Sequence, residues 1–308
     1  MGILGHPTAK IKDGTALVSA NYTRTYTSAE LFQDVTSKLF TTTRSTYALN
    51  CVYHASQEDM EKRVSWVPQW NSGQPCMSID PYQTFNASLA SETGDLFSAE
   101  RIGNRLKVSG FLFDTIILSS EQRLNSQDFE KQSLSDFKNP IEECWKLIEE
   151  PEVRRSRYHN RVQALLGPLI LGTYPIMDAL YADFYAYCRE FCTPGFYESL
   201  NPSRGSAEGE SPGGDWKRFL RRVRISNARK FFITRTGSSG LGPHIIQEGD
   251  RYCILFGSRT PFIIRRPGEE SCYKLVGECY IHGLMSGEFV QGWRKGSLRV
   301  ERQDIILD

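Results

Sequence analysis

Apolar residues recur at helical spacing near the start of the chain. Leu31, Val35 and Leu39 stand four residues apart, directly behind a Thr-Ser-Ala-Glu capping box at 27–30. The spacing places the three side chains on one face, and the capping box satisfies the first backbone N–H groups of a helix. The pattern therefore predicts a helix over about 28–40.

The middle of the chain predicts a strand followed by helices. Residues 105–117 carry apolar groups on both faces of an alternating pattern, which indicates a strand that is covered on each side. An Asn-Pro pair at 139–140 is typical of a helix start, and Pro151 ends that helix. A second helix is expected over 152–166, with its stop at the Gly-Pro pair 167–168.

The longest helical stripe comes next and is followed by a glycine-rich tail. Apolar residues recur every four positions over 176–192, and the Pro-Gly pair 194–195 is expected to close that helix. Residues 199–215 are poor in apolar groups. A short basic helix near Trp216 then leads into short β-rich runs, with glycine turns such as the one expected at 240–243.

The order of these elements is typical of an α+β protein. We expect a mixed α/β body with helices over 1–198 and a flexible loop or linker over 199–215. The remaining region, 216–308, is expected to be β-rich and to resemble a small barrel.

Composition narrows the class of protein. The 308 residues are 40% hydrophobic and 12% aromatic, enough for a sizeable core, and the net charge of +1 gives no overall attraction to nucleic acid. No signal peptide and no apolar run of the ~20 residues that a membrane span needs is present, so a cytoplasmic protein without a membrane span is expected. The eight cysteines form no Cys-x-x-Cys pair, which favours reduced, buried thiols.

Several motifs resemble the C-terminal region of fungal heterokaryon-incompatibility (HET) domain proteins. They are Asn-Tyr-Thr-Arg at 21–24, Ser-Trp-Val-Pro-Gln-Trp at 65–70, the run at 106–114 and the block from 229 to 285. Gln69 stands where the family usually has aspartate. The motifs of the N-terminal HET domain do not occur in this chain, so the resemblance does not carry over the cell-death activity of that domain.

Three sequence features are interpreted as structural. Cys188 and Cys192 lie on one face of an apolar helical stripe, which favours core packing over a metal site. The glycine-rich run 237–242 lacks the lysine of a phosphate loop, so we expect a turn and no bound cofactor. The basic residues after Trp216 are interpreted as a solvated face paired with acidic neighbours, with no role in nucleic-acid binding.

Six residues are candidates for a ligand site. His282, Tyr280 and Trp66 are the candidate catalytic donors, and a period of two places Tyr280 and His282 on one face of a strand. The apolar wall of the site is predicted to contain Trp70, Tyr181 and Tyr185. The alternative for the tryptophans is that they lock a long loop onto the core.

Two functions are compatible with the sequence. The chain resembles the HET-like proteins of sordarin-type diterpenoid pathways, which implies a cofactor-free cyclase that acts on a hydrophobic small molecule by an intramolecular Diels–Alder reaction. Such a ring closure needs a pocket that folds the substrate, and donors aimed at a carbonyl group. The alternative is a regulatory or protein-interaction module. The sequence carries no signal for an oligomeric state.

Overall fold

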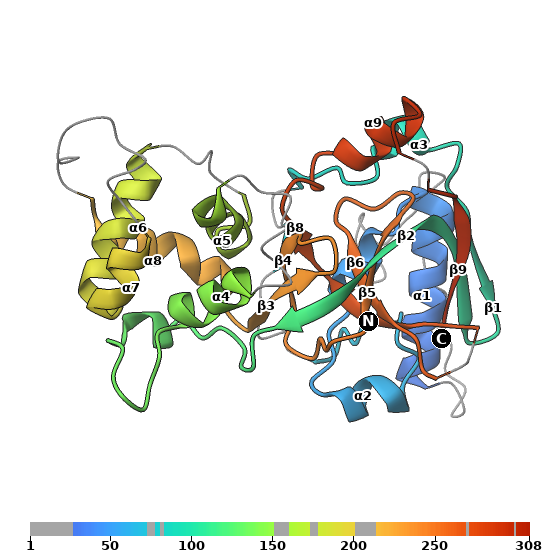
Figure 1. Ribbon diagram of the computed structural model, residues 1–308. Coiled ribbons are helices and arrows are strands. Elements are labelled where there is room, and N and C mark those ends of the chain that lie inside the picture. Colours follow the sequence, from blue (N-terminus) through green and yellow to red (C-terminus); the bar gives the residue numbers. More distant parts are fainter. Residues whose placement is uncertain are drawn as a thin grey trace.

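One end of the molecule consists mainly of helices, and a strongly curved sheet with further helices around it forms the other end (Figure 1). The computed structural model describes residues 27–72, 78–80, 83–150, 160–172, 178–200, 214–268, 271–298 and 300–308. Helices and antiparallel strands are both abundant, so the predicted α+β class is confirmed.

Helices occur before the strands of the sheet and between them. The α-helices are α1 (Ser28–Thr43), α2 (Gln57–Lys62), α3 (Ala90–Thr93), α4 (Pro140–Glu149), α5 (Arg161–Leu169), α6 (Asp178–Phe191), α7 (Pro194–Ser199), α8 (Trp216–Val223) and α9 (Glu288–Arg294). Short 3₁₀ helices are η3 (Tyr47–Cys51), η4 (Asp128–Glu130) and η6 (Arg224–Ser226). The helices α4 to α8 all lie in the chain between the strands Arg105–Ser119 and Arg229–Thr234, which are neighbours in the sheet.

The strands of the described residues form one antiparallel sheet. They are β1 (Ala99–Ile102), β2 (Arg105–Ser119), β3 (Arg229–Thr234), β4 (Ser239–Pro243), β5 (Arg251–Leu255), β6 (Phe262–Arg265), β7 (Lys274–Glu278), β8 (Tyr280–Ile281) and β9 (Gln303–Leu307). Their order is β7-β6-β5-β2-β3-β4-β8, and β1 and β9 both pair with one end of β2. The long strand β2, from the first half of the chain, therefore lies at the centre of the sheet.

The sheet closes into a small barrel through the chain itself. Strands β7 and β8 stand at the two ends of the strand order, yet only Cys279 separates them in the sequence. The backbone N–H of Cys279 donates to the carbonyl of Pro261, and β4 contacts β7 directly. A single continuous segment thus joins both edges of the sheet, and this closure removes the open edges that an extended sheet would expose.

Alternating residues of the barrel strands point into a shared interior. Six of the strands each contribute at least one side chain to a single buried cluster, which we call the barrel interior. It includes Phe111, Phe232, Ile254, Ile263, Val276 and Ile281. Helix α9 covers one end of it, where Phe289 and Trp293 pack edge-on against Phe111. The period of two explains why the neighbours of these residues point outwards.

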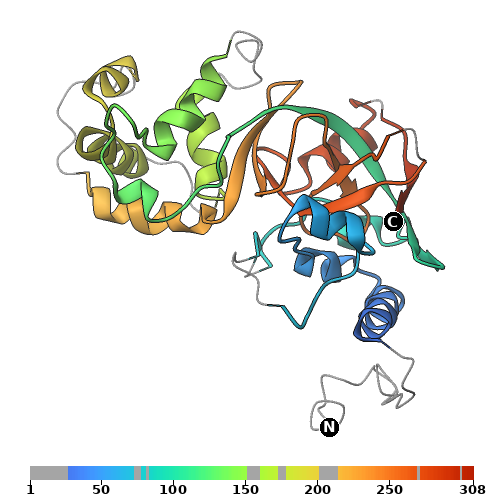
Figure 2. The same ribbon diagram turned by 90° about the horizontal axis from the view of Figure 1, so that it is seen from below.

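Two separate clusters cover the outside of the barrel. The N-terminal cluster packs α1, η3 and the following loop against β2, β5, β6, β7 and β9; it includes Phe40, Leu49, Trp66, Leu106, Leu255 and Phe262. The helical cluster packs α4 to α8 against β3, β4 and β8; it includes Ile141, Leu165, Phe184, Phe219, Phe231 and Tyr280. Figure 2 shows α1 and α2 beside the barrel and apart from α4 to α8.

Local start signals in the sequence predicted several elements well. The capping box at Thr27 is formed, and α1 begins at Ser28 as expected. Asn139 caps α4, Pro140 is its first residue, and β2 covers the expected strand. These elements depend on neighbouring residues alone, which is why the sequence predicts them.

One helix boundary differs from the sequence prediction and another agrees with it. The expected stop at 167–168 is wrong, because α5 continues through both residues to Leu169. Helix α6 ends at Phe191, just before the Pro-Gly pair, as expected; Pro194 also opens a new helix, α7, in whose first turn its missing N–H costs nothing. The expected start of the second helix, at 152, and most of the expected linker, 201–213, lie outside the described residues.

The expected turn at 240–243 is wrong as well, because these residues belong to strand β4. A Cβ atom on Gly240 would come within 2.3 Å of the Phe232 ring and 2.6 Å of the Tyr280 carbonyl oxygen. One on Gly242 would come within 2.6 Å of Ile263. The two glycines are therefore needed for space, because large side chains of the barrel interior fill the volume above them.

We expect Gly240→Ala to destabilise the barrel by about 1–3 kcal/mol or more, because the new methyl group overlaps a fully buried ring and a backbone oxygen. Urea denaturation followed by circular dichroism measures this change. Gly195→Ala is the matched control, since nothing lies within 4 Å of its Cβ position in α7. Equal stability of both variants would contradict this account of β4.

Candidate functional site

Tyr280 and His282 form a hydrogen-bonding pair at the junction of the barrel and the helices. The Tyr280 hydroxyl lies 3.3 Å from Nδ1 of His282, so the two side chains meet on one side of the backbone as expected. His282 itself does not belong to the strand, because β8 ends at Ile281 and His282 is the first residue of the turn that follows. Tyr280 is buried in the helical cluster, and His282 is half-buried. The ring of Phe85 lies 6.0 Å from the Tyr280 ring and adds an apolar neighbour to the pair.

Helix α5 forms the wall against which the pair rests. A Cβ atom on Gly167 would come within 2.4 Å of Nδ1 of His282, so the imidazole contacts the helix backbone directly. Just beyond the helix, a Cβ atom on Gly172 would come within 2.5 Å of the Tyr280 hydroxyl. Gly172 has a φ of +56°, a conformation that glycine adopts without strain. Both polar tips therefore fit only because these two positions lack side chains.

The environment keeps His282 neutral. Burial lowers the pKa of His282 from its ordinary value of 6.5, and the negative charge of Glu288 opposes this shift without cancelling it. A neutral imidazole offers one N–H donor and one acceptor, and the adjacent tyrosine offers a hydroxyl. One of these two hydrogens is used in the hydrogen bond between the side chains, so the pair can present at most one donor to a carbonyl oxygen. In an apolar setting such a bond is stronger than in water.

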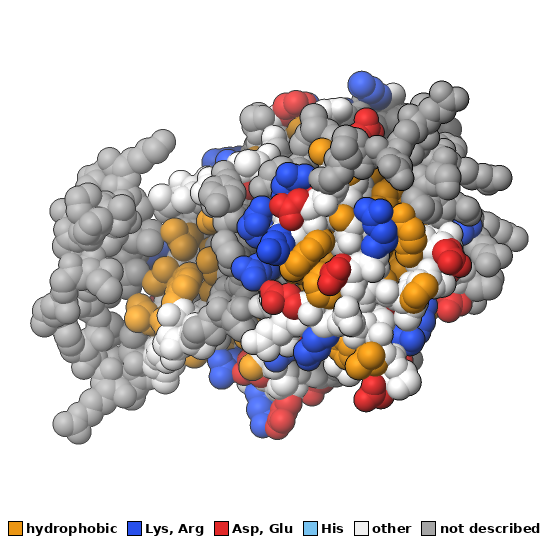
Figure 3. Space-filling model, turned by 90° about the vertical axis from the view of Figure 1, so that its left-hand side faces the viewer, with side chains coloured by type: hydrophobic (Ala, Val, Ile, Leu, Met, Phe, Trp, Pro, Cys, Tyr) orange, Lys and Arg blue, Asp and Glu red, His pale blue; other side chains and the backbone are white. Residues whose placement is uncertain are grey.

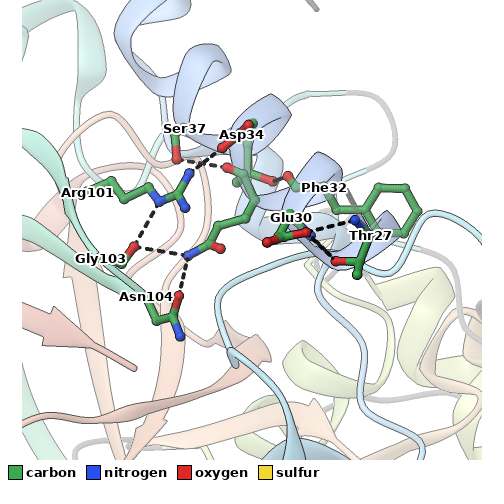
Figure 4. Close-up of polar contacts among 10 residues, drawn as sticks. Thr27, Glu30, Phe32, Asp34, Ser37, Arg101, Gly103 and Asn104 are labelled. Carbon is green, nitrogen blue, oxygen red and sulfur yellow. Dashed lines mark hydrogen bonds and ion pairs between the residues drawn. The ribbon is translucent and has the colours of Figure 1, made fainter. Parts of the chain in front are cut away.

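Trp66 lies elsewhere, in the N-terminal cluster on another face of the barrel. Its side chain is fully buried, and Nε1 donates to the carbonyl oxygen of Asn104 at 2.8 Å. Asn104 belongs to the turn between β1 and β2. Helix α1 also holds this turn, because Gln33 donates to the Gly103 carbonyl at 3.2 Å and Asp34 pairs with Arg101 (Figure 4). The structure does not bring Trp66 together with His282, and its indole N–H already has a structural partner.

The predicted wall residues are divided between the two clusters. Trp70 is 42% exposed and packs edge-on against Phe32 of α1, with ring centroids 5.5 Å apart. Tyr181 and Tyr185 stack on each other in α6 and pack against the helical cluster. The Tyr181 hydroxyl accepts a hydrogen bond from Asn160, the residue that caps α5. Tyr181 therefore lies beside the start of α5, and the other end of α5 contacts His282.

A buried carboxylate next to the pair was not singled out from the sequence. Glu278 accepts hydrogen bonds from Arg229 at 2.9 Å, Asn50 at 2.7 Å, the backbone N–H of Ile79 at 2.7 Å and Ser78 at 3.2 Å. Arg229 and Glu278 are both almost fully buried. Both residues lie in the block 229–285 that resembles the HET family, but no sequence pattern indicates that the two side chains form an ion pair.

The basic helix α8 is paired with acidic residues, as expected. Arg218 and Arg222 both bind the buried carboxylate of Asp183, and Arg224 lies 3.1 Å from Glu130. Burial alone would raise the pKa of Asp183, but the hydrogen bonds from Arg218 and the backbone N–H of Asp215 outweigh it and lower that pKa. Figure 3 shows the helical end, where acidic and basic side chains lie interspersed.

Neither a metal cluster nor a membrane helix is seen in the part of the chain that the structure describes. No group of three or more His, Cys, Asp or Glu side chains there is arranged to hold a metal ion. None of the described helices combines the length and the apolarity that crossing a membrane requires. The sulfur of Cys188 is buried in the helical cluster, as its apolar stripe predicted.

The fold is a small antiparallel β-barrel with two separate groups of helices packed on its outside. Residues 212–300 match the Het-6 beta-barrel domain family. Heterokaryon incompatibility protein 6, OR allele, of Neurospora crassa is 31% identical over 87 residues, which cover 28% of this chain and 12% of the relative. The chain thus spans a small part of that relative's length. No solved structure matches.

These matches support a relationship between the C-terminal region of the chain and the HET family, as the motifs at 229–285 suggested. The matched range contains β3 to β8 and α9, and so it includes Tyr280 and His282. It does not include β2 or α5. The site therefore combines residues from the matched region with a wall from outside it.

We expect Trp66→Phe to cost about 0.5–1.5 kcal/mol of folding free energy, because the fully buried indole loses its hydrogen bond to the carbonyl oxygen of Asn104. Chemical denaturation measures this loss. The pKa of His282, followed by NMR, should stay unchanged in the same variant because the two residues lie in different clusters. A variant of undiminished stability with a shifted His282 pKa would place Trp66 at the site after all.

We expect an NMR titration of His282 to give a pKa below 6.5, because burial disfavours the imidazolium ion. The folded state then binds fewer protons than the unfolded chain between the two pKa values. The stability that neutral His282 contributes is fully present above about pH 6.5 and is lost as the pH falls towards the folded-state pKa. Glu288→Gln should lower the pKa further, and an increase would contradict this electrostatic assignment.

Proposed function

We propose that the chain binds a hydrophobic small molecule at the His282–Tyr280 pair and closes a ring in it by an intramolecular Diels–Alder reaction, without a cofactor. The observation that carries this proposal is the pair itself. A hydroxyl and a neutral imidazole lie 3.3 Å apart against an apolar cluster, and two glycines make room for them. Such a pair is suited to bind the carbonyl oxygen of an activated alkene.

The reaction asks two things of the protein. A concerted ring closure forms two carbon–carbon σ bonds and one new π bond from three π bonds, so no proton or electron has to be supplied. The protein must hold diene and alkene close together, which reduces the entropic part of the barrier. A hydrogen bond from the His282–Tyr280 pair to the carbonyl would stabilise the negative charge that gathers there in the transition state.

The proposed apolar wall is carried by helices α5 and α6. Helix α5 runs from its cap at Asn160, beside Tyr181, to Gly167, beside His282. At 1.5 Å per residue these two positions are about 10 Å apart, a distance comparable to the length of a folded polycyclic substrate. Tyr181 and Tyr185 are retained in this proposal as wall residues. Trp66 and Trp70 are not, because they pack with the N-terminal cluster.

The second candidate function is a regulatory or protein-interaction module. The specific observation in its favour is the similarity of the C-terminal region to an incompatibility protein. In that case the His282–Tyr280 pair would dock α5 onto the barrel and bind no small molecule. The two functions therefore differ in what substitution of the pair does to turnover.

The test is incubation of the purified chain with a diene-bearing diterpenoid aldehyde acid, without added cofactor, followed by chromatography and mass spectrometry. We expect a new isomer of unchanged mass, formed faster or more selectively than in the background reaction. His282→Ala and Tyr280→Phe should each reduce the rate by about 10–100-fold, in line with the loss of one donor to a developing oxyanion.

His244→Ala is the matched control, because that histidine contacts the carbonyl of Ala55 and the ring of Tyr53, away from the pair. It should keep the full rate. Only the uncatalysed product ratio, or full turnover by both pair variants, would overturn the enzymatic proposal and favour the interaction module.

A further inference from the structure

Helix α5 contains a proline where its backbone needs a donor. In an α-helix the N–H of residue 168 would donate to the carbonyl of Ala164, but Pro168 has no N–H. Ala164 is buried, so water does not supply the missing hydrogen bond. A buried carbonyl without a donor is costly, and a helix with such a defect would normally kink or end there.

The barrel supplies the missing donor. The hydroxyl of Ser239, the first residue of β4, donates to the Ala164 carbonyl at 2.7 Å. Ser239 is itself fully buried, so this hydroxyl has no competing bulk water. The side chain thus takes the place of the proline N–H and explains why α5 continues through Pro168 to Leu169.

The same residue also holds the candidate site. The carbonyl oxygen of Ser239 accepts the backbone N–H of His282 at 3.1 Å. Its side chain therefore fixes α5, while its main chain fixes the start of the turn after β8 that carries the imidazole. Gly167, the neighbour of Pro168, is the point where α5 contacts His282. A small shift of the helix would change the packing of the imidazole directly.

We propose that Ser239 is a positioning residue for the His282–Tyr280 pair, because its hydroxyl replaces the N–H that Pro168 lacks and so locks α5 against the imidazole. The positioning of the pair stands on the structure alone. Its importance for turnover rests on the proposed function. The hydroxyl acts on the site through the helix, and no contact with substrate is assigned to it.

The test is a double-mutant cycle with Ser239→Ala, Pro168→Ala and the double variant. Ser239→Ala should lower the folded-to-unfolded ratio about tenfold or more, because a buried acceptor loses its donor. Pro168→Ala restores a backbone N–H to Ala164. In that background the removal of the hydroxyl should cost less than about threefold, since the helix can satisfy its own carbonyl.

A second measurement separates positioning from stability alone. NMR titration of the folded proteins should show the His282 pKa returning towards 6.5 in Ser239→Ala, because a loosened α5 lets water reach the imidazole. The double variant should restore the low value. Glu288 is the charged group that acts on this pKa, and it is unchanged throughout.

Ser238→Ala is the matched control. Ser238 is the preceding residue and equally buried, but its hydroxyl has no hydrogen-bond partner in the structure. This substitution should leave both the stability and the His282 pKa unchanged, or slightly increase stability. Ser239→Thr, which keeps the hydroxyl, should retain the wild-type His282 pKa.

Three results would overturn the proposal. One is an equal cost of Ser239→Ala with and without Pro168, and another is an unchanged His282 pKa in the folded Ser239→Ala protein. If Ser239→Ala does not fold, recovery of folding in the double variant supports the proposal, and failure of both overturns it. Because these measurements need no substrate, a chain without cyclase activity can still pass them, so the two proposals fail separately.

Discussion

The carboxylate of Glu278 imposes the strongest constraint on how the parts of this molecule fit together. A carboxylate removed from water needs charge compensation and hydrogen bonds to nearly all of its lone pairs. Here the donors come from Arg229 on β3, Asn50 on η3, and Ser78 and Ile79 in the following loop. Separating any of these segments from the barrel would leave a buried charge without its partners. The N-terminal segments and the barrel are therefore coupled through one side chain.

This coupling reaches the candidate site because Glu278 stands two residues before Tyr280. The carboxylate fixes the end of β7, Cys279 carries the closure of the barrel, and Tyr280 follows at once on the outer face. On the other side, Ser239 fixes α5 against His282. The pair is thus held from the barrel side by charge and from the helical side by one hydroxyl. Its geometry is a property of the whole junction rather than of its own two residues.

The sequence predicted those features that depend on neighbouring residues. The capping box of α1, the Asn-Pro start of α4 and the shared side of Tyr280 and His282 all follow from local patterns. The extension of α5 through Pro168 was not predictable, because the donor that compensates for it comes from Ser239, 75 residues after the Ala164 carbonyl that it binds. The strand position of Gly240 depends partly on the Tyr280 carbonyl oxygen, which comes from β8, much later in the chain. Aromatic composition identified Trp66 as a candidate, but only tertiary packing decides which face of the barrel a side chain reaches.

The position of the helices in the chain has an evolutionary consequence. Strands β2 and β3 are antiparallel neighbours, a pair that a short hairpin loop can join, yet α4 to α8 are inserted between them. The barrel requires only that the two ends of this insertion emerge side by side, because a long connection adds little to the entropic cost of closing a loop. A descendant lineage can therefore lengthen, shorten or exchange the insertion while it keeps the barrel. Only the positions that touch β3, β4 and β8 must be inherited together with it, so the rest of the insertion can diverge without a new scaffold.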